Sequence, residues 1–468
     1  MPDSNKINIT SEPRGNGSTC ASGLEMYIPS LANGNPQNQA NLMNKVASLA
    51  NLKLAFKAVK RNKGAPGIDN ITISQIEENL NEHLNQLQTS LTDGTFRPVA
   101  VRGVAIPKKG GKLRQLGIPT VIDRVVQQAI AQVLSPIFDP TFSNSSYGFR
   151  PKRSAHDAVK AASGFVKEGR SWVVDIDLEQ FFDNVNHDKL MSKLAKTITD
   201  KSLLKLIRRF LSVGLMQDGL IKARAQGTPQ GGPLSPLLSN IALADLDAEL
   251  ERRGHKFCRY ADDCNIYVKS AEAAKRVMRS ISSFIKVRLK LKANSAKSAA
   301  AQVNKRQFLG FRLYKDGKVA ITKDSVVKLK DKIRKITKRN RGISLNTMVI
   351  ELNQVVRGWF HYFKLSEHPT ILKELDCWIR RRLRCYRIKQ RKRKYSIKTM
   401  LSSMGQNQQD SWAIACSRQG WWGKSLNQVV HRAMNLEWFK KLGLFALHEH
   451  FVIHKSKTAV CDNARTVV

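Results

Sequence analysis

The apolar positions of this chain repeat at helical spacing in several long segments. They recur every three or four residues over 42–56, 122–134 and 155–166, which predicts an amphipathic helix in each, and a further helix is expected at 74–90. Asp123 is expected to cap the helix that begins near residue 122, because Asp is a common N-cap residue.

Short β-type runs lie between these helices. Residues 99–118 alternate around turn residues and predict a hairpin with a basic tip at 108–112. A short strand is expected at 172–178, a hairpin with an acidic turn at 257–268, and another strand at 306–314. Because strands and helices alternate through this part of the chain, the sequence predicts a mixed α/β domain.

The chain reads differently at its two ends. Residues 1–38 are rich in Asn, Ser, Gly and Pro and show no period, so a mobile arm is expected there. After residue 323 the pattern is helical, and apolar residues keep the 3.6-residue period over 345–360. The segment 371–394 joins an apolar edge to a dense run of basic residues.

Length and charge narrow the class of protein. A chain of 468 residues suggests two to four domains, and 42% hydrophobic residues exclude a wholly disordered chain. Lys and Arg number 79 against 37 Asp and Glu, a formal net charge of +42. Such an excess indicates a polyanionic partner, nucleic acid first and a membrane surface as the alternative.

The cysteine pattern indicates a reducing compartment. Seven cysteines with no C-x-x-C pair fit neither a disulfide framework nor a zinc ribbon. We find no signal peptide and no apolar run of about 18 residues, so no membrane span is expected and the location is predicted to be cytoplasmic.

Acidic residues follow two of the predicted β-runs. Residues 260–263 (YADD) place Asp262 and Asp263 at a turn, where two ionised carboxylates repel unless a cation lies beside them. Mg²⁺ prefers such oxygen ligands, although an isolated pair is also typical of a solvated turn. In 173–178 (VVDIDL), Asp175 and Asp177 share one face of a strand. Asp175 and Asp183 are more simply explained by capping or ion pairing, and Asp183 is expected to cap a helix at 187–195.

The third motif is a glycine-rich loop at 226–236 (QGTPQGGPLSP) that opens an apolar helix. Glycines allow another backbone to come close, and a helix N-terminus can hold phosphate. No Lys-Ser or Lys-Thr follows, so this is not a Walker motif, and an ordinary turn explains the loop equally well.

Taken in order, the Asp177 motif, the glycine-rich loop and the YADD turn resemble those of reverse transcriptases. Five further segments are similar to the group II intron-encoded reverse transcriptase and maturase family: 114–119 (RQLGIP), 123–127 (DRVVQ), 147–151 (YGFRP), 308–311 (FLGF) and 358–362 (GWFHY). The resemblance extends over roughly residues 40–450.

This resemblance implies a right-hand polymerase with an α+β palm sheet, fingers and a helical thumb, followed by a basic helical maturase region. The implied boundaries are an N-terminal arm at 1–38, fingers with an N-terminal extension at 39–150, the catalytic palm at 151–322, the thumb and maturase domain at 323–405, and a C-terminal nucleic-acid-binding region and tail at 406–468. Because neither C-x-x-C nor H-N-H appears, a C-terminal endonuclease domain is expected to be absent.

The resemblance also implies the catalytic residues. Asp177, Asp262 and Asp263 would hold two Mg²⁺ ions, with the Leu178 carbonyl as a further ligand. One ion would lower the pKa of the primer 3′-hydroxyl and the other would bind the triphosphate, so that catalysis is positioning and charge neutralisation.

Nucleotide-binding roles follow by position. Phe182 would lie under the incoming sugar and exclude a 2′-hydroxyl, or simply pack in the core. Lys108 and Arg114 would contact the triphosphate or the template, and Gln230 the nucleotide or the template. By its position in the sequence, Lys297 corresponds to the palm lysine of the family, whose implied role is to protonate pyrophosphate. The residues before Lys297 depart from the family pattern.

The basic run would bind RNA through phosphate contacts, since residues 377–400 hold eleven Lys or Arg and no acid. A solvated helix face is the alternative. The candidate RNA-binding residues are Arg380, Arg381, Arg382, Arg384, Arg387, Lys389, Arg391, Lys392, Arg393 and Lys394.

The function implied is an RNA-directed DNA polymerase that also binds its group II intron RNA as a maturase, promotes splicing and supports intron mobility. Its partners would be intron RNA, an RNA template, a DNA primer or target and deoxynucleoside triphosphates, with no membrane and no other protein. One alternative is a reverse transcriptase of the retron, diversity-generating or defence type, which the long thumb and basic tail disfavour. The other is a binding-only maturase, which the intact carboxylates disfavour.

Overall fold

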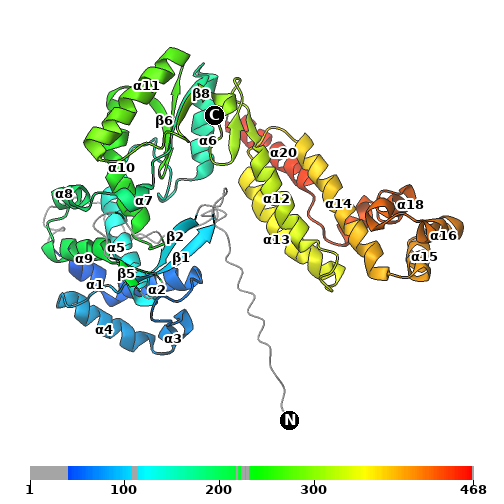
Figure 1. Ribbon diagram of the computed structural model, residues 1–468, viewed down its shortest axis with the longest axis horizontal. Helices are drawn as coiled ribbons and strands as arrows, with labels where there is room; N and C mark the ends of the chain where they lie inside the picture. The colour runs from blue at the N-terminus through cyan, green and yellow to red at the C-terminus, as the bar shows by residue number, and fades with distance from the viewer. Residues whose placement is uncertain (1–40, 108–112, 218–219, 223–226, 228–230, 466–468) are drawn as a thin grey trace, which may run out of the picture. The chain divides into compact units, whose positions relative to one another are not determined.

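The computed structural model describes residues 41–107, 113–217, 220–222, 227 and 231–465. The predicted arm at 1–38 and the hairpin tip at 108–112 lie outside the described residues. The chain divides into two compact units (Figure 1). The first consists of Met1–Ala158, Val174–Val268 and Glu272–Ala300, and the second of Val159–Val173, Lys269–Ala271 and Ala301–Val468.

The first unit begins with helices that are shorter than the apolar period suggests. The helix expected from residue 41 is two helices, α1 (Leu42–Ala47) and α2 (Leu49–Arg61), because the Ser48 side chain accepts a hydrogen bond from the Asn51 amide and caps α2. The helix expected at 74–90 divides at Asn79 into α3 (Ile73–Glu78) and α4 (Leu80–Thr92).

The predicted hairpin at 99–118 is confirmed. Strands β1 (Val101–Pro107) and β2 (Leu113–Ile118) pair antiparallel. They belong to a four-stranded sheet of order β2-β1-β4-β5, in which β4 is Leu215–Gln217 and β5 is Leu220–Lys222. Helix α5 (Val121–Phe138) follows β2 directly.

The expectation that Asp123 caps α5 is wrong. Thr120 is the N-cap, and its hydroxyl accepts a hydrogen bond from the Asp123 amide at 3.0 Å. Asp123 lies one turn inside the helix, where its buried carboxylate accepts from the Val99 amide at 3.2 Å. Both residue types favour N-caps, and the one that precedes the apolar period takes the position.

A second four-stranded sheet, of order β6-β7-β3-β8, carries the acidic motifs. The predicted 257–268 hairpin is β6 (Lys256–Tyr260) and β7 (Asp263–Val268), and the predicted 172–178 strand is β3 (Trp172–Ile176). Strand β8 is Ala299–Gln302. The helices of this part of the chain are α6 (Ala155–Lys167), α7 (Phe181–Asn184), α8 (His187–Thr197), α9 (Lys201–Ser212), α10 (Ser235–Arg252) and α11 (Ala271–Phe284).

The second unit is mainly helical and has its own apolar core. The strand expected at 306–314 is shorter, β9 (Phe311–Leu313), and pairs with β10 (Val319–Ile321). The remaining helices are α12 (Lys323–Ile336), α13 (Leu345–Phe363), α14 (Thr370–Arg391), α15 (Lys394–Ser403), α16 (Gln408–Cys416), α17 (Trp421–Lys424), α18 (Gln428–Ala433), α19 (Leu436–Lys441) and α20 (Leu447–Arg465). Their core includes Leu352, Leu383, Leu401 and Met434, all fully buried.

The predicted fold class, a mixed α/β region followed by a helical one, is confirmed. Within the described part of the chain, none of the helices combines the length and the apolar character needed to cross a bilayer.

Candidate active site

The YADD turn is a two-residue hairpin loop held in a strained conformation. Tyr260 pairs with Asp263, so Ala261 and Asp262 form the loop. Ala261 has φ 58°, in the left-handed region that costs a non-glycine residue roughly 1–2 kcal/mol. Its carbonyl accepts a hydrogen bond from Arg259 Nη1 at 2.9 Å, which fixes the turn.

Arg259 is the anchor of this turn and is completely buried. Its guanidinium binds Asp247 on α10 through two bonds, Nε to Oδ1 at 2.7 Å and Nη2 to Oδ2 at 2.6 Å. Asn240 Oδ1 and Ser146 Oγ accept further hydrogen bonds at 2.9 and 2.7 Å. Removing one partner of such a buried pair costs about 3–5 kcal/mol. Sequence reasoning missed this residue, although an arginine inside the apolar run that ends at Tyr260 is the signal that marks it.

The YGFRP segment packs against the same turn. The Tyr147 amide donates to the Arg259 carbonyl at 2.8 Å. A Cβ at Gly148 would lie 2.3 Å from the Ala261 nitrogen, so only glycine fits there. The next residue, Phe149, also has a positive φ of 57°, is 53% exposed, and places its ring 6.3 Å from that of Tyr260.

Asp177 follows the end of β3, which neighbours β7 in the sheet. Its amide donates to Ser298 Oγ at 3.0 Å, and its carbonyl accepts from the Asn294 amide at 2.8 Å. Leu178 lies opposite Ala293 in a single antiparallel bridge whose two bonds use the Asp177 carbonyl and the Glu179 amide. The bridge therefore does not use the Leu178 carbonyl, the group predicted as a metal ligand.

Lys297 lies against the first carboxylate. Its Nζ is 3.2 Å from Asp177 Oδ2 and 3.5 Å from Oδ1. Both side chains are partly open to solvent, Lys297 at 64% and Asp177 at 35%. The structure thus brings Lys297 together with Asp177, although 120 residues separate them in the chain.

The carboxylates have the right chemistry for a divalent cation, but the described residues do not form a finished metal site. Asp263 is the first residue of β7, and β7 neighbours β3, the strand that carries Asp175 and ends beside Asp177. Among the residues that the structure describes, no three His, Cys, Asp or Glu side chains gather into a set that could hold an ion. The two-ion site stays a prediction.

The glycine-rich loop meets the segment that follows Asp177. The Gly227 amide donates to the Val185 carbonyl at 2.9 Å, and the Gly227 carbonyl lies 2.6 Å from His187 Nε2. Gly227 has φ 90°, and a Cβ there would lie 2.7 Å from the carbonyl oxygens of Phe182 and Asp183. His187 therefore has a structural role, because it holds the loop at Gly227.

The expected capping role of Asp183 is wrong, whereas the expected role of Phe182 stays a prediction. Asp183 does not cap the next helix, because Asn186 is the N-cap of α8 and accepts from the Lys189 amide at 2.9 Å. Phe182 is half-buried, with its ring edge-on to Phe181 at 5.3 Å, and its role under the incoming sugar stays a prediction.

The end of the glycine-rich loop reaches two more motifs. A Cβ at Gly231 would lie 2.5 Å from the Gly117 carbonyl on β2, and one at Gly232 would lie 2.0 Å from Gln127 Oε1 on α5. The loop therefore joins the RQLGIP and DRVVQ segments to the Phe182 segment. Three predicted nucleotide-binding groups lie outside the described residues: Lys108, Gln230 and the side chain of Arg114.

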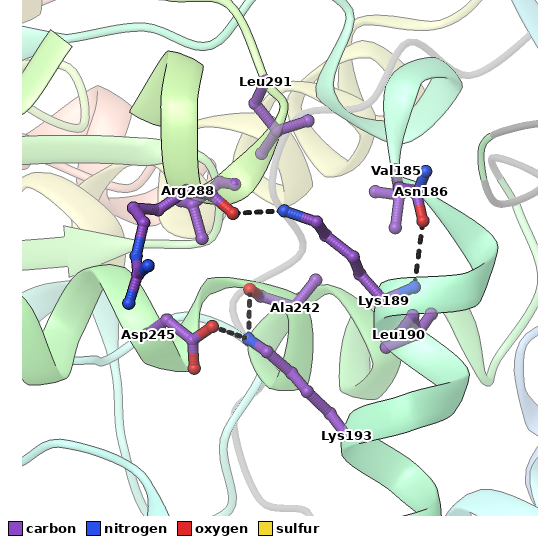
Figure 2. A pocket seen from close by; sticks show the side chains of 10 residues that line it. Val185, Asn186, Lys189, Leu190, Lys193, Ala242, Asp245, Arg288 and Leu291 are labelled. Atoms are coloured by element: carbon purple, nitrogen blue, oxygen red, sulfur yellow. Dashed lines mark hydrogen bonds and ion pairs between the residues drawn. The ribbon is translucent and has the colours of Figure 1, made fainter. Parts of the chain in front are cut away.

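Figure 2 shows a small cavity beside Val185 and Asn186, lined also by Lys189, Lys193 and Asp245. Its volume is about 30 Å³, which is room for a water molecule. Lys193 pairs with Asp245 at 2.9 Å and donates to the Ala242 carbonyl at 2.9 Å, and Lys189 binds the Arg288 carbonyl. These lysines connect α8 to neighbouring segments and are structural.

The basic residues predicted to bind RNA, all in the second unit, do not form one solvated face. Arg391, Lys392, Arg393 and Lys394 are exposed, and the other six are half-buried or buried. Several of those six make internal contacts, such as Arg382 Nε to Thr337 Oγ1 at 2.5 Å and Lys389 Nζ to the Arg339 carbonyl at 2.7 Å. The buried member is Arg384, whose Nε and Nη2 bind the Met434 carbonyl at 3.1 and 2.9 Å.

Two family models match adjacent parts of the chain. Residues 106–313 match the model of reverse transcriptase (RNA-dependent DNA polymerase). Residues 326–402 match the maturase-specific domain of group II introns. The first range contains the YADD turn, Asp177 and the glycine-rich loop, and the second contains α13 and α14.

The chain is also similar to individual curated proteins. The chain is 34% identical to protein YkfC of Escherichia coli over 301 residues, which cover 55% of this chain and 79% of that protein. It is 38% identical to the group II intron-encoded protein LtrA of Lactococcus lactis over 209 residues, 44% of this chain and 34% of that protein. Among solved structures, a partial Cas6-RT-Cas1–Cas2 complex is 27% identical with a TM-score of 0.35, over 53% of this chain and 42% of that one.

Proposed function

The chain belongs to the group II intron-encoded reverse transcriptases and maturases, and we propose that its two units divide the work of that family between them. It is an RNA-directed DNA polymerase with a right-hand fold and a splicing maturase. We assign nucleotidyl transfer to the palm at 151–322, whose proposed catalytic aspartates lie in the first unit. We assign intron RNA binding to the thumb and maturase residues from 323 onward, which lie in the second unit.

The observation that supports the catalytic assignment is the close packing of six separate sequence segments. Gly148 and Ala261 bring YGFRP to YADD, while Gly227, Gly231 and Gly232 bring the glycine-rich loop to the Phe182, Gly117 and Gln127 segments. At Gly148, Gly227 and Gly231 the nearest atoms are backbone atoms, so these contacts fix one backbone against another, whereas Gly232 meets the Gln127 side chain. Such a frame can hold a primer end, a template base and a triphosphate in register.

We assign two Mg²⁺ ions to Asp177, Asp262 and Asp263, with the Leu178 carbonyl as a further ligand. Bound there, the ions would supply Lewis-acid stabilisation of the attacking and leaving oxygens. Lys297 neutralises Asp177 in the structure described, and in the proposed complex its ammonium turns to the pyrophosphate. Phe182 packs against the sugar, and Lys108, Arg114 and Gln230 contact the triphosphate or the template.

The maturase assignment concerns four exposed cations at the point where α14 ends and α15 begins. Arg391, Lys392, Arg393 and Lys394 are consecutive and exposed, at the junction of α14 and α15. Cations at such a position bind phosphates without reading sequence. We therefore assign them to group II intron RNA. A DNA primer or target strand is the other nucleic acid that the polymerase requires.

The catalytic proposal is tested by replacing Asp262 and Asp263 with Asn in one variant. Primer extension on an RNA template with deoxynucleoside triphosphates should be lost, while RNA affinity and thermal unfolding stay close to wild type. Asp188→Asn is the matched control, since Asp188 is 82% exposed on the surface of the same unit. Extension that survives the double substitution would remove the carboxylates from catalysis. Wild-type protein that binds RNA without extending a primer would favour the binding-only maturase.

A further inference from the structure

An open cavity of about 760 Å³ lies in the second unit between α14 and the segment that carries α18 and the start of α19. Its volume is in the range of about 300–1,000 Å³ typical of ligand pockets. The Arg384 guanidinium crosses from α14 to bind the Met434 carbonyl, so the two walls are tied together. One wall belongs to the maturase-specific match at 326–402 and the other lies beyond both family models.

The cavity is strongly cationic. Four basic side chains and one imidazole line it against a single carboxylate, Glu374: Lys373, Arg380, Arg381, Arg384 and His431. No ion pair recorded between described side chains includes any of these cations. Uncompensated positive charge in a concave site attracts an anion, and Arg is suited to phosphate because its planar fork donates two parallel bonds.

The cations also crowd one another. Burial lowers the pKa of Arg384 to about 10, and the charge of Arg380 is the second cause. Burial, and then the charges of Arg384, Arg380 and Arg381, lower the pKa of His431, whose backbone contact with Ser425 opposes this. Arg384 Nη1 lies 3.3 Å from His431 Nε2, the distance of a donor to a neutral imidazole. A bound phosphate would relieve this repulsion.

Apolar side chains stand at the same cavity. Leu426 and Leu436 line it and are 53% and 58% exposed, and Trp378 forms part of the wall. The guanidinium of Arg381 stacks 3.8 Å above the Trp422 ring, and its Nε is buried with no hydrogen-bond partner among the described atoms. Asn435 adds an amide to the lining. Exposed apolar groups beside a phosphate site suit a nucleotide better than an inorganic anion or an acidic peptide.

We propose that this cavity binds one unstacked nucleotide of single-stranded RNA, with its phosphate at Lys373 and Arg380 and its base against Leu426 and Leu436. RNA is favoured over DNA because α14 is part of the maturase-specific match. The assignment rests on the proposed RNA-binding function of the second unit and deepens it. In this assignment, the segment after residue 402 forms one side of a nucleotide-binding pocket.

The test uses the full-length protein and three fluorescent probes, a 12-residue single-stranded RNA, the DNA of the same sequence and the fully paired RNA duplex. Arg380→Glu is compared with Arg418→Glu, an equal charge change at an exposed residue that does not line the cavity. Leu426→Ser is compared with Ile350→Ser, an equally exposed apolar residue outside it. Thermal unfolding checks that each variant is folded.

We expect Arg380→Glu to weaken single-stranded RNA binding about tenfold or more and Leu426→Ser about three- to tenfold, a range set by a base contact of about 1 kcal/mol. The matched controls and duplex binding should change much less. A 4-thiouridine in the single strand should cross-link to the peptide that contains residues 426–436.

Three outcomes would overturn the assignment. If each cavity variant behaves like its control, the cavity is not a nucleotide site. If single-stranded DNA loses affinity as much as RNA does, the occupant is not RNA in particular. If the affinity for the RNA duplex falls by the same factor as the affinity for single-stranded RNA, the cavity binds phosphate without contacting a base. Wild-type protein that binds none of the probes would instead refute the proposed RNA-binding function.

Discussion

At the scale of single residues, buried charges carry much of the site's architecture. Arg259 binds Asp247, Asn240 and Ser146 inside the first unit. Its remaining donor binds the strained carbonyl of Ala261. A charge that is paired and hydrogen-bonded in this way specifies one arrangement, because every partner that it loses is left buried and unsatisfied. The acidic turn is therefore positioned by a residue that need not touch substrate.

Asp123 is a buried carboxylate whose ionisation opposes folding. Burial raises its pKa to about 6 from an ordinary value of 3.8, and hydrogen bonds from Thr120 and Val99 only partly offset this. Between these two values the folded state keeps a proton that the unfolded state has lost. Stability therefore falls as pH rises through the window from about 4 to 6, by on the order of 2 kcal/mol, and stays lower above it.

Asp123→Asn should remove this pH dependence. The amide stays neutral and its oxygen can still accept from the Val99 amide, so the variant should exceed wild type in unfolding free energy by about 1–2 kcal/mol at pH 7.5 and match it near pH 4. Urea unfolding across this range measures the difference, with the exposed Asp331→Asn as control. A variant that is equally destabilised at every pH would mean that the ionised carboxylate is required.

In the proposed metal site, Lys297 would compete with the ion for Asp177. The pair is partly exposed, and such ion pairs contribute about 0.2–1 kcal/mol. Lys297→Met should therefore lower the half-saturating concentration of Mn²⁺, measured directly by electron paramagnetic resonance, by up to about fivefold. Lys292→Met, which removes an exposed lysine paired with Glu179, is the control. Unchanged Mn²⁺ affinity would show that Lys297 leaves the carboxylate available already.

At the scale of elements, close backbone contacts decide where the loops lie. Gly227 combines φ 90° with a Cβ position 2.7 Å from two carbonyl oxygens, whereas Gly94 has φ 66° with open space around it. Gly94→Ala should cost about 1 kcal/mol, the price of the left-handed backbone alone. Gly227→Ala adds a steric clash of about 1–3 kcal/mol and must move the loop away from the Phe182 segment.

We therefore expect Gly227→Ala to abolish most primer extension and Gly94→Ala to leave it near wild type. Thermal unfolding and extension on an RNA template should be measured on the same preparations. If Gly227→Ala loses stability but extends primers normally, then the contact with Phe182 and Asp183 does not position the reacting groups.

The sequence predicted elements well where the signal is local and periodic. The β6–β7 hairpin follows from alternation and an acidic turn, and α13 follows from apolar residues at 3.6-residue spacing. Helix boundaries were harder to predict. Ser48 caps a helix at a point where the apolar period continues, and Thr120 caps one although a second capping residue type, Asp123, lies three residues later. Each boundary depends on which polar side chain reaches an unpaired amide, and periodicity contains no information on this.

Long-range pairs explain the remaining differences. The run of basic residues along α14 predicts one RNA-binding face, yet Arg384 is buried because the Met434 carbonyl, 50 residues later, satisfies its guanidinium. Nothing near Arg384 in the sequence distinguishes it from the exposed cations that follow at 391–394. In the same way, the likeness to a known family indicates the three aspartates proposed to be catalytic, while Arg259 is found only when the fold brings Asp247 to it.

At the scale of the whole molecule, a net charge of +42 acts on every contact with nucleic acid. A general positive field speeds association and binds any polyanion, whereas a local cluster adds affinity at one place. The charge total therefore does not show which basic residues serve the maturase function. Separating the two effects requires charge removal at the proposed site and, in equal amount, elsewhere.

Replacing Arg391, Lys392, Arg393 and Lys394 with Ala tests this separation. For single-stranded RNA each phosphate contact contributes about 0.7 to the slope of log K against log salt, so loss of four contacts should lower its magnitude by up to about 3. Removing four exposed cations of the first unit, Lys53, Lys57, Arg61 and Lys63, is the matched control. Filter binding to intron RNA at several salt concentrations measures both.

Primer extension on a short generic template should survive the first change, because the carboxylates lie in the other unit. Equal slopes in the two variants would mean that total charge, rather than the junction of α14 and α15, determines RNA affinity.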